Sequence, residues 1–534
     1  MTAATPFEPC AEPRAEPRAE PTKSLADDFF ARAAAQPGHP AILGPRPEPI
    51  ETYAALAIRV QGLAAALADA GVRPGMNIGL HYPSGAAYIA YTYAIWACGA
   101  CVTPIPTELA GAEKRLIPRC IALDGIISGQ RGHAELLDGA AARVGGELPE
   151  QALYLTDTRL REPPPGLADL HPAFIRFTSG TTGAAKGVVL SHATIRARIA
   201  AANAVMAIGP EDRVVWLLSM AYHFAVSIVA YLSYGAAIVL PANAFGVSIL
   251  KAADDHRGTL IYGSPTHYDL MTHDADARLP DSLRLAVVTT ARLRPELAER
   301  FRARFGRGLN ETYGIIEIGL PAINHDGARA HEGSVGRLLP AYTLKLVPTA
   351  EADPEASDTP TGEVLLQGPG LLDAYYDPWR PRAEILAARG GWLATGDLGR
   401  LDADGYLTLV GRAKDLISVG GMKFFPQEVE RVLEQHPGIS EACVYGVSHP
   451  RDGEQPHADL VLAPAVTAQP DPAALEAHCR ELLAPYKVPQ RFRIVAALPR
   501  TASGKLLRRG ERPPAQDGMS APSARTSRHA QARP

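Results

Sequence analysis

A chain of 534 residues is too long for a single hydrophobic core, so we expect two or more domains. Its composition, 46% hydrophobic and 21% charged, is typical of a globular protein, and a net charge of −4 argues against a nucleic-acid partner. Six cysteines are too few for a disulfide framework, which indicates a reducing compartment, and we expect a cytoplasmic protein.

The two ends of the chain have the composition of tails. Residues 1–23 repeat Ala-Glu-Pro-Arg, and residues 511–534 are rich in Pro, Ser, Arg and Ala. Such segments lack the apolar residues of a core or of a signal peptide, so we expect both to be disordered.

Between residues 24 and 411, short runs of Val, Ile and Leu alternate with helical stretches. This alternation predicts a large α/β domain with buried strands, and the segments "GEVLLQGPG" and "GYLTLVG" predict a β-rich portion near its end. The pattern restarts at Arg412. Residues 412–510 predict a small α+β domain with helices at "FPQEVERVLEQ" and "DPAALEAHCRELL".

Residues 214–240 carry no formal charge and are long enough to cross a bilayer. His223, three serines and Gly235 interrupt this run, and neither flank carries a basic cluster. We therefore expect a strand, a loop, a short apolar helix and a second strand inside the core, and no membrane span.

The stretch "TSGTTGAAKG" at residues 178–187 has the composition of a phosphate-binding loop. Glycines let backbone N–H groups approach an anion, and hydroxyls and an ammonium group add donors. It is not a Walker A loop, because Ala185 stands where that motif needs a glycine. Strand-like flanks favour a ligand site over the alternative, a flexible surface loop.

Seven segments together resemble, in chain order, those of the adenylate-forming enzymes, the family of acyl-CoA synthetases, nonribosomal peptide adenylation domains and firefly-luciferase-like proteins. They are "FTSGTTGAAKG", "NETYGIIEIG", "GSVGRLLP", "GEVLLQG", "WLATGDLG", "GRAKDLISVGGMKFFPQEVE" and "LPRTASGKLLRR". Ordered matches from residue 177 to residue 509 are far more specific than the loop alone. The resemblance, strongest to acyl-CoA synthetases, implies a ligase that forms an acyl-adenylate from a carboxylic acid and ATP with Mg²⁺, then passes the acyl group to a thiol.

The resemblance also implies roles for individual residues. The predicted catalytic residues are Lys505, Glu317, Lys186 and His223, with Glu317 as the magnesium ligand. The predicted ATP- and AMP-binding residues are Thr178, Ser179, Gly180, Thr181, Thr182, Lys186, Tyr313, Gly314, Asp397, Arg412 and Lys505. Tyr313 would stack on adenine, Asp397 and Arg412 would bind the ribose, and Lys505 would reach the reacting carboxylate and the α-phosphate.

In this family the small domain rotates after adenylation. By resemblance, Lys414 would be the hinge, and Gly420, Gly421 and Lys423 would line the thiol channel. The expected acceptor is coenzyme A. A separate phosphopantetheinyl carrier protein is the alternative acceptor, and a non-catalytic adenylate-binding sensor or scaffold is the alternative of another class. The sequence leaves monomer and homodimer open.

The acid is predicted from the segment around His223. Amino-acid-activating members carry an aspartate there, and this chain has none. His223 resembles the gate residue of acyl-CoA synthetases, with a hydrogen-bonded core histidine as the alternative. The predicted acyl pocket comprises Tyr222, His223, Phe224, Thr290, Ile315, Ile316 and Ile318. Its apolar character predicts a fatty or otherwise hydrophobic carboxylic acid, and with it a role in fatty acid metabolism. An aryl acid stays open.

Two departures from the family pattern fall in this region. Ile316 replaces a threonine that would offer a hydroxyl to the α-phosphate, and Thr289-Thr290-Ala291-Arg292 stands where Gly-Gly-Ala-Pro is usual.

Overall fold

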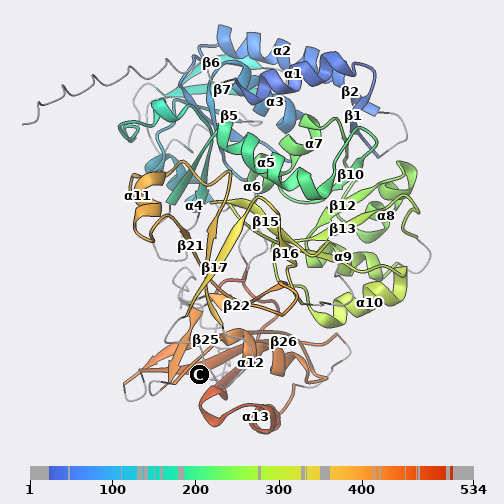
Figure 1. Cartoon of the computed structure of the whole chain (residues 1–534), viewed down its shortest axis with the longest axis vertical. Coiled ribbons are helices and arrows are strands. Elements are labelled where there is room, and N and C mark those ends of the chain that lie inside the picture. The colour runs from blue at the N-terminus through green and yellow to red at the C-terminus, as the bar shows by residue number, and fades with distance from the viewer. Residues whose placement is uncertain are drawn as a thin grey trace, which may run out of the picture. The chain divides into compact units, whose positions relative to one another are not determined.

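Figure 1 shows the chain as a computed structural model, coloured from the N-terminus to the C-terminus. Two compact units make up the chain, the first running to Asp415 and the second beginning at Leu416. The structure describes residues 23–45, 49–109, 111–128, 136, 142–148, 151–156, 160–178, 186–274, 278–325, 331, 333–348, 361–412, 415–419, 422–450, 453–464, 466, 469–500 and 506–508. The two expected tails lie outside these residues, except for Lys23.

In the described part of the first unit, nine strands form one mixed sheet. Its central strands β4, β3 and β5 are parallel and wholly buried, as expected for apolar runs covered on both faces. The strand order is β20 (Arg380–Pro381), β19 (Ala374–Tyr375), β9 (Lys186–Ser191), β8 (Pro172–Thr178), β4 (Cys101–Pro104), β3 (Asn77–His81), β5 (Gly125–Ser128), β7 (Gln151–Thr156) and β6 (Ala142–Leu148).

A second sheet in the same unit likewise contains nine strands among the residues described. Parallel pairing links β1, β11, β10, β12, β13 and β14, and antiparallel strands close both edges. The order is β16 (Arg337–Leu338), β15 (Gly319–Ile323), β14 (Asn310–Ile315), β13 (Leu285–Val288), β12 (Leu260–Gly263), β10 (Arg213–Trp216), β11 (Ala237–Val239), β1 (Pro40–Leu43) and β2 (Pro49–Thr52).

Helices fill the space between the two sheets and cover their outer faces. The largest hydrophobic cluster joins inner faces of both sheets to α1 (Leu25–Ala35), α2 (Tyr53–Asp69), α3 (Ala86–Ala97), α5 (His192–Met206) and α7 (Ile228–Ser233). The outer face of the second sheet packs on α8 (Gly246–Asp255), α9 (Pro265–Thr272) and α10 (Pro295–Phe305), which lie together in Figure 1. A third cluster places α4 (Gly111–Cys120) on the outer face of the first sheet.

The β-rich portion expected near the end of the first unit is an antiparallel sheet. Its four strands among the described residues are, in order, β17 (Thr343–Pro348), β18 (Gly362–Gln367), β21 (Leu393–Leu401) and β22 (Leu407–Arg412). The short helix α11 (Arg382–Ala387) precedes β21.

The uncharged segment 214–240 folds as expected. It contains most of β10, the short helix α6 (Met220–His223), a 3₁₀ turn at Phe224–Val226, helix α7 and strand β11. Among the residues described, no helix combines the length and the apolar character that crossing a membrane requires.

The second unit is a small α+β fold. Its described strands pair in the order β24 (Met422–Phe424), β23 (Ile417–Val419), β26 (Gly453–Leu462) and β25 (Ile439–His449), with β27 (Arg491–Ile494) parallel to β26. Helices α12 (Pro426–Glu434) and α13 (Pro472–Leu482) pack on one face. Pro426 occupies the first turn of α12, and the Asp471 side chain accepts a hydrogen bond from the Ala473 N–H to cap α13.

Candidate active site

The predicted phosphate loop lies between two paired strands. β8 and β9 are antiparallel, and their register places Thr178 opposite Lys186. The Ser191 hydroxyl then accepts from the Thr194 N–H and starts α5, so the strand leads directly into a helix. Ser179, Gly180, Thr181 and Thr182 lie outside the described residues, as do the side chains of Thr178 and Lys186, so their phosphate contacts stay predictions.

Three of the predicted nucleotide-binding residues meet at the β-rich sheet. Asp397 on β21 faces Arg412 on β22 in the antiparallel register. Arg412 Nε lies 2.9 Å from Asp397 Oδ1, and the Tyr313 hydroxyl donates to Asp397 Oδ2 at 2.5 Å. The Asp397 side chain is only 7% exposed, so this carboxylate is held between a cation and a phenol. Such a carboxylate can accept hydrogen bonds from a pair of vicinal hydroxyls with its remaining lone pairs.

The negative charge of Asp397 favours the protonated forms of both Arg412 and Tyr313. Burial lowers the pKa of Arg412, but Asp397 and other nearby acidic groups outweigh that effect and raise it. Burial, followed by Asp397, raises the pKa of Tyr313, so its hydroxyl keeps its proton and remains a donor. The stacking of Tyr313 on adenine stays a prediction.

Glu317 lies in the turn between β14 and β15, and several contacts fix that turn. The Leu372 N–H donates to the Glu317 carbonyl at 2.7 Å, and the Tyr375 hydroxyl donates to Glu317 Oε1 at 3.2 Å. On the other side, Arg198 Nη1 donates to the Ile316 carbonyl at 3.0 Å. The carboxylate is therefore aimed by its surroundings, and its second oxygen makes no hydrogen bond with a described residue.

Arg198 was not predicted from the sequence, although it is nearly fully buried on α5. Its Nε and Nη2 both donate to the Gly370 carbonyl, and Gly370 at φ 70° packs so closely that an added Cβ would lie 2.5 Å from the Arg198 Cβ. Burial lowers the pKa of Arg198 to about 10, which leaves it charged at neutral pH. The signal in the sequence was an arginine on the apolar face of a helix, next to Ile195 and Ile199.

Glu317 also meets the requirement for a magnesium ligand. Among the described residues, no cluster of three or more His, Cys, Asp or Glu side chains could hold a metal alone. A single oriented carboxylate is nevertheless what Mg²⁺ needs when substrate phosphates and water supply its other oxygen ligands. The residues therefore fit a metal that arrives with the nucleotide.

The predicted acyl-pocket residues divide into two groups. Phe224 and Ile318 are fully buried, and Phe224 packs against the rings of Tyr88, Tyr93 and Trp96, so their contacts are core contacts. Tyr222, His223, Thr290, Ile315 and Ile316 are half-buried. Their assignment to an acyl pocket stays a prediction.

His223 is uncharged at neutral pH. Burial, followed by the charge of Arg176, lowers its pKa to about 3. Its ring lies edge-on to Trp216, with centroids 6.3 Å apart, and makes no hydrogen bond to any residue that the structure describes. The alternative of a hydrogen-bonded core histidine thus has no partner for the ring among the described residues, and the gate role stays a prediction.

Thr290 has a left-handed backbone with φ 75°, a conformation that β-branched residues rarely adopt. This is the position where the family pattern has a glycine. The departure seen in the sequence therefore places strain in the backbone at the predicted acyl pocket.

A second arginine missed by sequence reasoning, Arg176, lies on β8. Its Nη1 donates to the Tyr222 carbonyl at 2.7 Å, and its guanidinium carbon lies 5.1 Å from the centre of the Tyr222 ring. Its Nε is shielded from water and has no hydrogen-bond partner. The sequence shows only an arginine inside a strand pattern, which gives no indication of this partner.

The described part of the predicted thiol channel is small. β23 and β24 pair antiparallel with Val419 opposite Met422, on either side of positions 420 and 421 in the sequence. Lys423 lies on β24, but its side chain, Gly420, Gly421, Lys414 and Lys505 lie outside the described residues. Their roles stay predictions.

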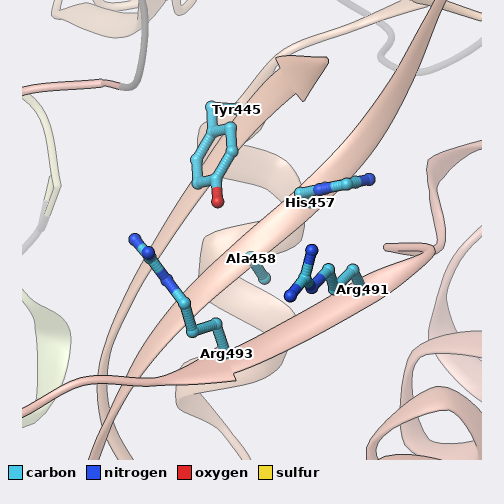
Figure 2. A pocket seen from close by; sticks show the side chains of 5 residues that line it. All are labelled: Tyr445, His457, Ala458, Arg491 and Arg493. Carbon is cyan, nitrogen blue, oxygen red and sulfur yellow. The ribbon is translucent and has the colours of Figure 1, made fainter. Parts of the chain in front are cut away.

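The second unit also contains a pocket of about 80 Å³, shown in Figure 2. Its lining residues are Tyr445, His457, Ala458, Arg491 and Arg493. Arg493 pairs with the fully buried Asp459 at 2.8 and 2.6 Å, and the Tyr445 hydroxyl donates to the same carboxylate at 3.0 Å. The charge of Arg493 is thus already balanced, and this network joins β25, β26 and β27.

Comparisons with known proteins agree along nearly the whole chain. The family model for AMP-binding enzymes matches residues 29–376, and the model for the AMP-binding enzyme C-terminal domain matches residues 428–505. A sulfoacetate–CoA ligase of Cupriavidus necator is 34% identical over 500 residues, covering 91% of this chain and 96% of that protein. A feruloyl-CoA synthase of Amycolatopsis is 31% identical and covers 86% of this chain and 92% of its own.

A solved structure has a similar fold. The o-succinylbenzoate CoA synthetase of Bacillus subtilis, in complex with its acyl-adenylate intermediate, superimposes with a TM-score of 0.74 at 26% identity. The similarity covers 91% of this chain and 97% of that one.

Proposed function

Because this chain belongs to the family of AMP-binding enzymes, we propose that it activates a carboxylic acid with ATP and transfers the acyl group to the thiol of coenzyme A. Membership confirms the resemblance to adenylate-forming enzymes and the expected α/β fold with a large first and a small second domain. It also confirms an acid–thiol ligase that uses ATP, Mg²⁺ and coenzyme A, since relatives spanning the chain are CoA ligases and one solved neighbour holds ATP and magnesium.

The observation that carries this function is the Tyr313–Asp397–Arg412 cluster beside the Glu317 turn. The cluster offers a carboxylate to ribose hydroxyls, and the turn offers a carboxylate to the metal that accompanies the phosphates. Both are held by backbone and side-chain contacts before any substrate arrives. Positioning of this kind is the main contribution that a protein makes to phosphoryl and nucleotidyl transfer.

In the first step, a carboxylate oxygen of the acid attacks the α-phosphorus of ATP. A bond forms between that oxygen and phosphorus, the bond from the α-phosphorus to the bridging oxygen breaks, and pyrophosphate leaves. Mg²⁺, when bound, neutralises charge on the phosphate oxygens. We propose that Lys505 donates to the reacting carboxylate and α-phosphate oxygens, where two negatively charged reactants meet.

In the second step, the thiol of coenzyme A attacks the acyl carbon, and AMP leaves as the carbon–oxygen bond breaks. The thiol loses its proton to water as the carbon–sulfur bond forms. His223 supplies no positive charge to the leaving phosphate, because burial and then Arg176 lower its pKa to about 3. We propose that His223 acts as an uncharged gate between the acyl group and the thiol, while the strand pair around residues 420 and 421 admits the pantetheine arm.

The acid itself is proposed from the half-buried residues. Ile315 and Ile316 are half-buried against the main hydrophobic cluster, and Tyr222 is half-buried as well, which supports an acid with an apolar or aromatic portion. The fatty acid expected from the sequence is one member of that class. The named relatives act on acids as different as sulfoacetate and ferulate, so relatedness alone does not select among them.

The function is tested by exchange of radiolabelled pyrophosphate into ATP over a panel of short, fatty, aryl and dianionic carboxylic acids. We expect exchange with at least one acid without coenzyme A, and a thioester only after coenzyme A is added. No exchange with any acid would overturn the ligase. If a thioester forms with a purified acyl carrier protein and not with coenzyme A, the proposed acceptor is wrong but the adenylation step stands.

A further inference from the structure

We propose that the acid activated by this enzyme carries a second anionic group, a sulfonate or carboxylate, and that Arg176 recognises it. The inference rests on the proposed function and names the substrate class of that same site. It makes Arg176 a specificity-determining residue of the proposed acyl site.

The strand directs Arg176 toward the predicted pocket. On β8, Phe174 belongs to the core cluster that contains Phe224, whereas Ile175 belongs to the cluster on the opposite face of the sheet. Side chains alternate along a strand, so Arg176 shares the face of Phe174. Its contacts agree, since it donates to the Tyr222 carbonyl and lies over the Tyr222 ring.

No acidic partner among the described residues balances the charge of Arg176. Among the described residues it contacts one carbonyl and one ring, and no carboxylate there forms an ion pair with it. Glu317 is near enough to act on it electrostatically but makes no salt bridge. A guanidinium has five N–H donors, and here Nε is shielded from water without a partner. Burial of a cation in this way is costly unless an anion joins it.

Three other arginines of the first unit have partners for their charge or for their N–H donors. Arg412 pairs with Asp397, and Arg284 pairs with Asp212 at 2.9 Å. Arg198 has no acid partner, but all three of its nitrogens donate to carbonyls. Arg176 is therefore set apart among these arginines by donors left without acceptors.

The surroundings select an anion over a neutral group. His223, the neighbouring titratable side chain on α6, is neutral at physiological pH and adds no competing charge. A planar guanidinium can donate two parallel hydrogen bonds to a carboxylate or sulfonate. Such charge-assisted bonds are about twice as strong as neutral ones. The Tyr222 ring supplies an apolar surface next to the guanidinium.

An oxyanion on Arg176 has two sources, the tail of the acid or a phosphate of ATP. We assign it to the acid because both Arg176 contacts are with Tyr222, next to the proposed gate His223. The two sources give different kinetics, since loss of a phosphate contact raises the KM for ATP with every acid, and loss of a tail contact changes discrimination among acids.

The test uses pairs of acids that match in shape and differ in the charge of the tail. They are sulfoacetate with methylsulfonylacetate, adipate with its monomethyl ester, and terephthalate with its monomethyl ester. Pyrophosphate exchange gives kcat/KM for each acid with the wild type, Arg176→Gln and Arg176→Lys. Arg196→Gln is the matched control, because the Arg196 side chain is partly exposed and pairs with Asp28 at 2.8 Å.

We expect the wild type to favour the dianion at least tenfold in one pair, and Arg176→Gln to lose about 10- to 100-fold for that dianion with little change for its neutral partner or in the KM for ATP. Arg176→Lys keeps part of the preference, and Arg196→Gln keeps all of it.

If the wild type favours the neutral partners or a plain fatty acid, the inference is overturned. Pyrophosphate exchange with those acids would still support the proposed ligase activity. If Arg176→Gln loses kcat/KM equally for both acids of a pair, Arg176 has a structural role and the inference is overturned. The inference is also overturned if Arg176→Gln raises the KM for ATP but keeps the preference among acids. If Arg176→Gln does not fold, the wild-type preference and Arg176→Lys decide. Absence of exchange with every acid would instead count against the ligase.

Discussion

Arg198 donates a 3.0 Å hydrogen bond to the carbonyl of Ile316, the residue directly before the proposed magnesium ligand Glu317. The same guanidinium holds the Gly370 carbonyl, two residues before Leu372, whose N–H donates to the Glu317 carbonyl. One buried side chain on α5 thus fixes both backbone segments that orient Glu317. We therefore propose Arg198 as a positioning residue that acts through these two backbone segments.

Arg198→Met should therefore lower both stability and the response to magnesium. It leaves two buried carbonyls without donors, which costs about 1–3 kcal/mol each. We expect a lower Tm and a several-fold higher Mg²⁺ concentration for half-maximal pyrophosphate exchange, with partial rescue by Arg198→Lys. Arg196→Gln, on the exposed side of the same helix, is the control. Reduced stability with an unchanged Mg²⁺ response would show that Arg198 supports the fold alone.

Asp397→Asn should weaken ATP binding. The substitution keeps the shape of the side chain but leaves Arg412, which lies 2.9 Å away, without its anion, and removes the charge that ribose hydroxyls would meet. We expect the KM for ATP to rise about 10- to 100-fold, with a smaller change in the KM for the acid. Asp255→Asn, at an exposed helical ion pair with Lys251, serves as the control. An unchanged KM for ATP would remove Asp397 from the nucleotide site.

Much of the fold was predictable because its causes are local. Apolar runs gave the strands, and Pro426, Asp471 and Ser191 mark helix starts through backbone capping within a few residues. The split of segment 214–240 followed from its polar interruptions in the same way.

The parts of the site that were missed depend on distant contacts. Arg198 reaches a carbonyl 118 residues away, and Arg176 reaches one 46 residues away. No periodicity in the sequence encodes those pairings, because they exist only once two sheets and a helix have packed together. Asp397 and Arg412 were named from the family resemblance, and their contact follows from the register of β21 and β22.

Thr290→Gly should stabilise the protein. Thr290 adopts φ 75°, where a Cβ is unfavourable by about 1–2 kcal/mol, and glycine removes that strain at some cost in unfolded-state entropy. We expect a net gain of about 1 kcal/mol in urea unfolding. Thr290→Ala keeps the Cβ and should give no gain, and Gly306→Ala, at φ 69°, should be destabilising. Equal stability of the glycine and alanine variants would mean that the backbone at Thr290 is not strained.

Lys505→Ala should separate the two steps. If Lys505 serves only the first, the variant loses pyrophosphate exchange by several orders of magnitude but still forms the thioester from supplied acyl-adenylate and coenzyme A. Equal loss of both steps would contradict the assignment of Lys505 to adenylation. Lys251→Ala, at a surface ion pair, should leave both rates unchanged.

His223 should make the protein less stable as the pH falls. Its pKa in the folded state is about 3, whereas an unfolded histidine titrates near ~6.5, so the unfolded chain binds about one more proton between these values. Stability that is fully present above pH ~6.5 is then lost as the pH falls toward 3. His223→Gln removes this proton uptake, so its urea-unfolding free energy should fall less steeply between about pH 6.5 and 4.5 than that of the wild type.

His192 contributes a similar slope, because burial and then Arg196 lower its pKa to about 4. We therefore expect His192→Gln to flatten the profile independently. Identical slopes for the wild type and His223→Gln would mean that the imidazole is not kept neutral by its burial beside Arg176.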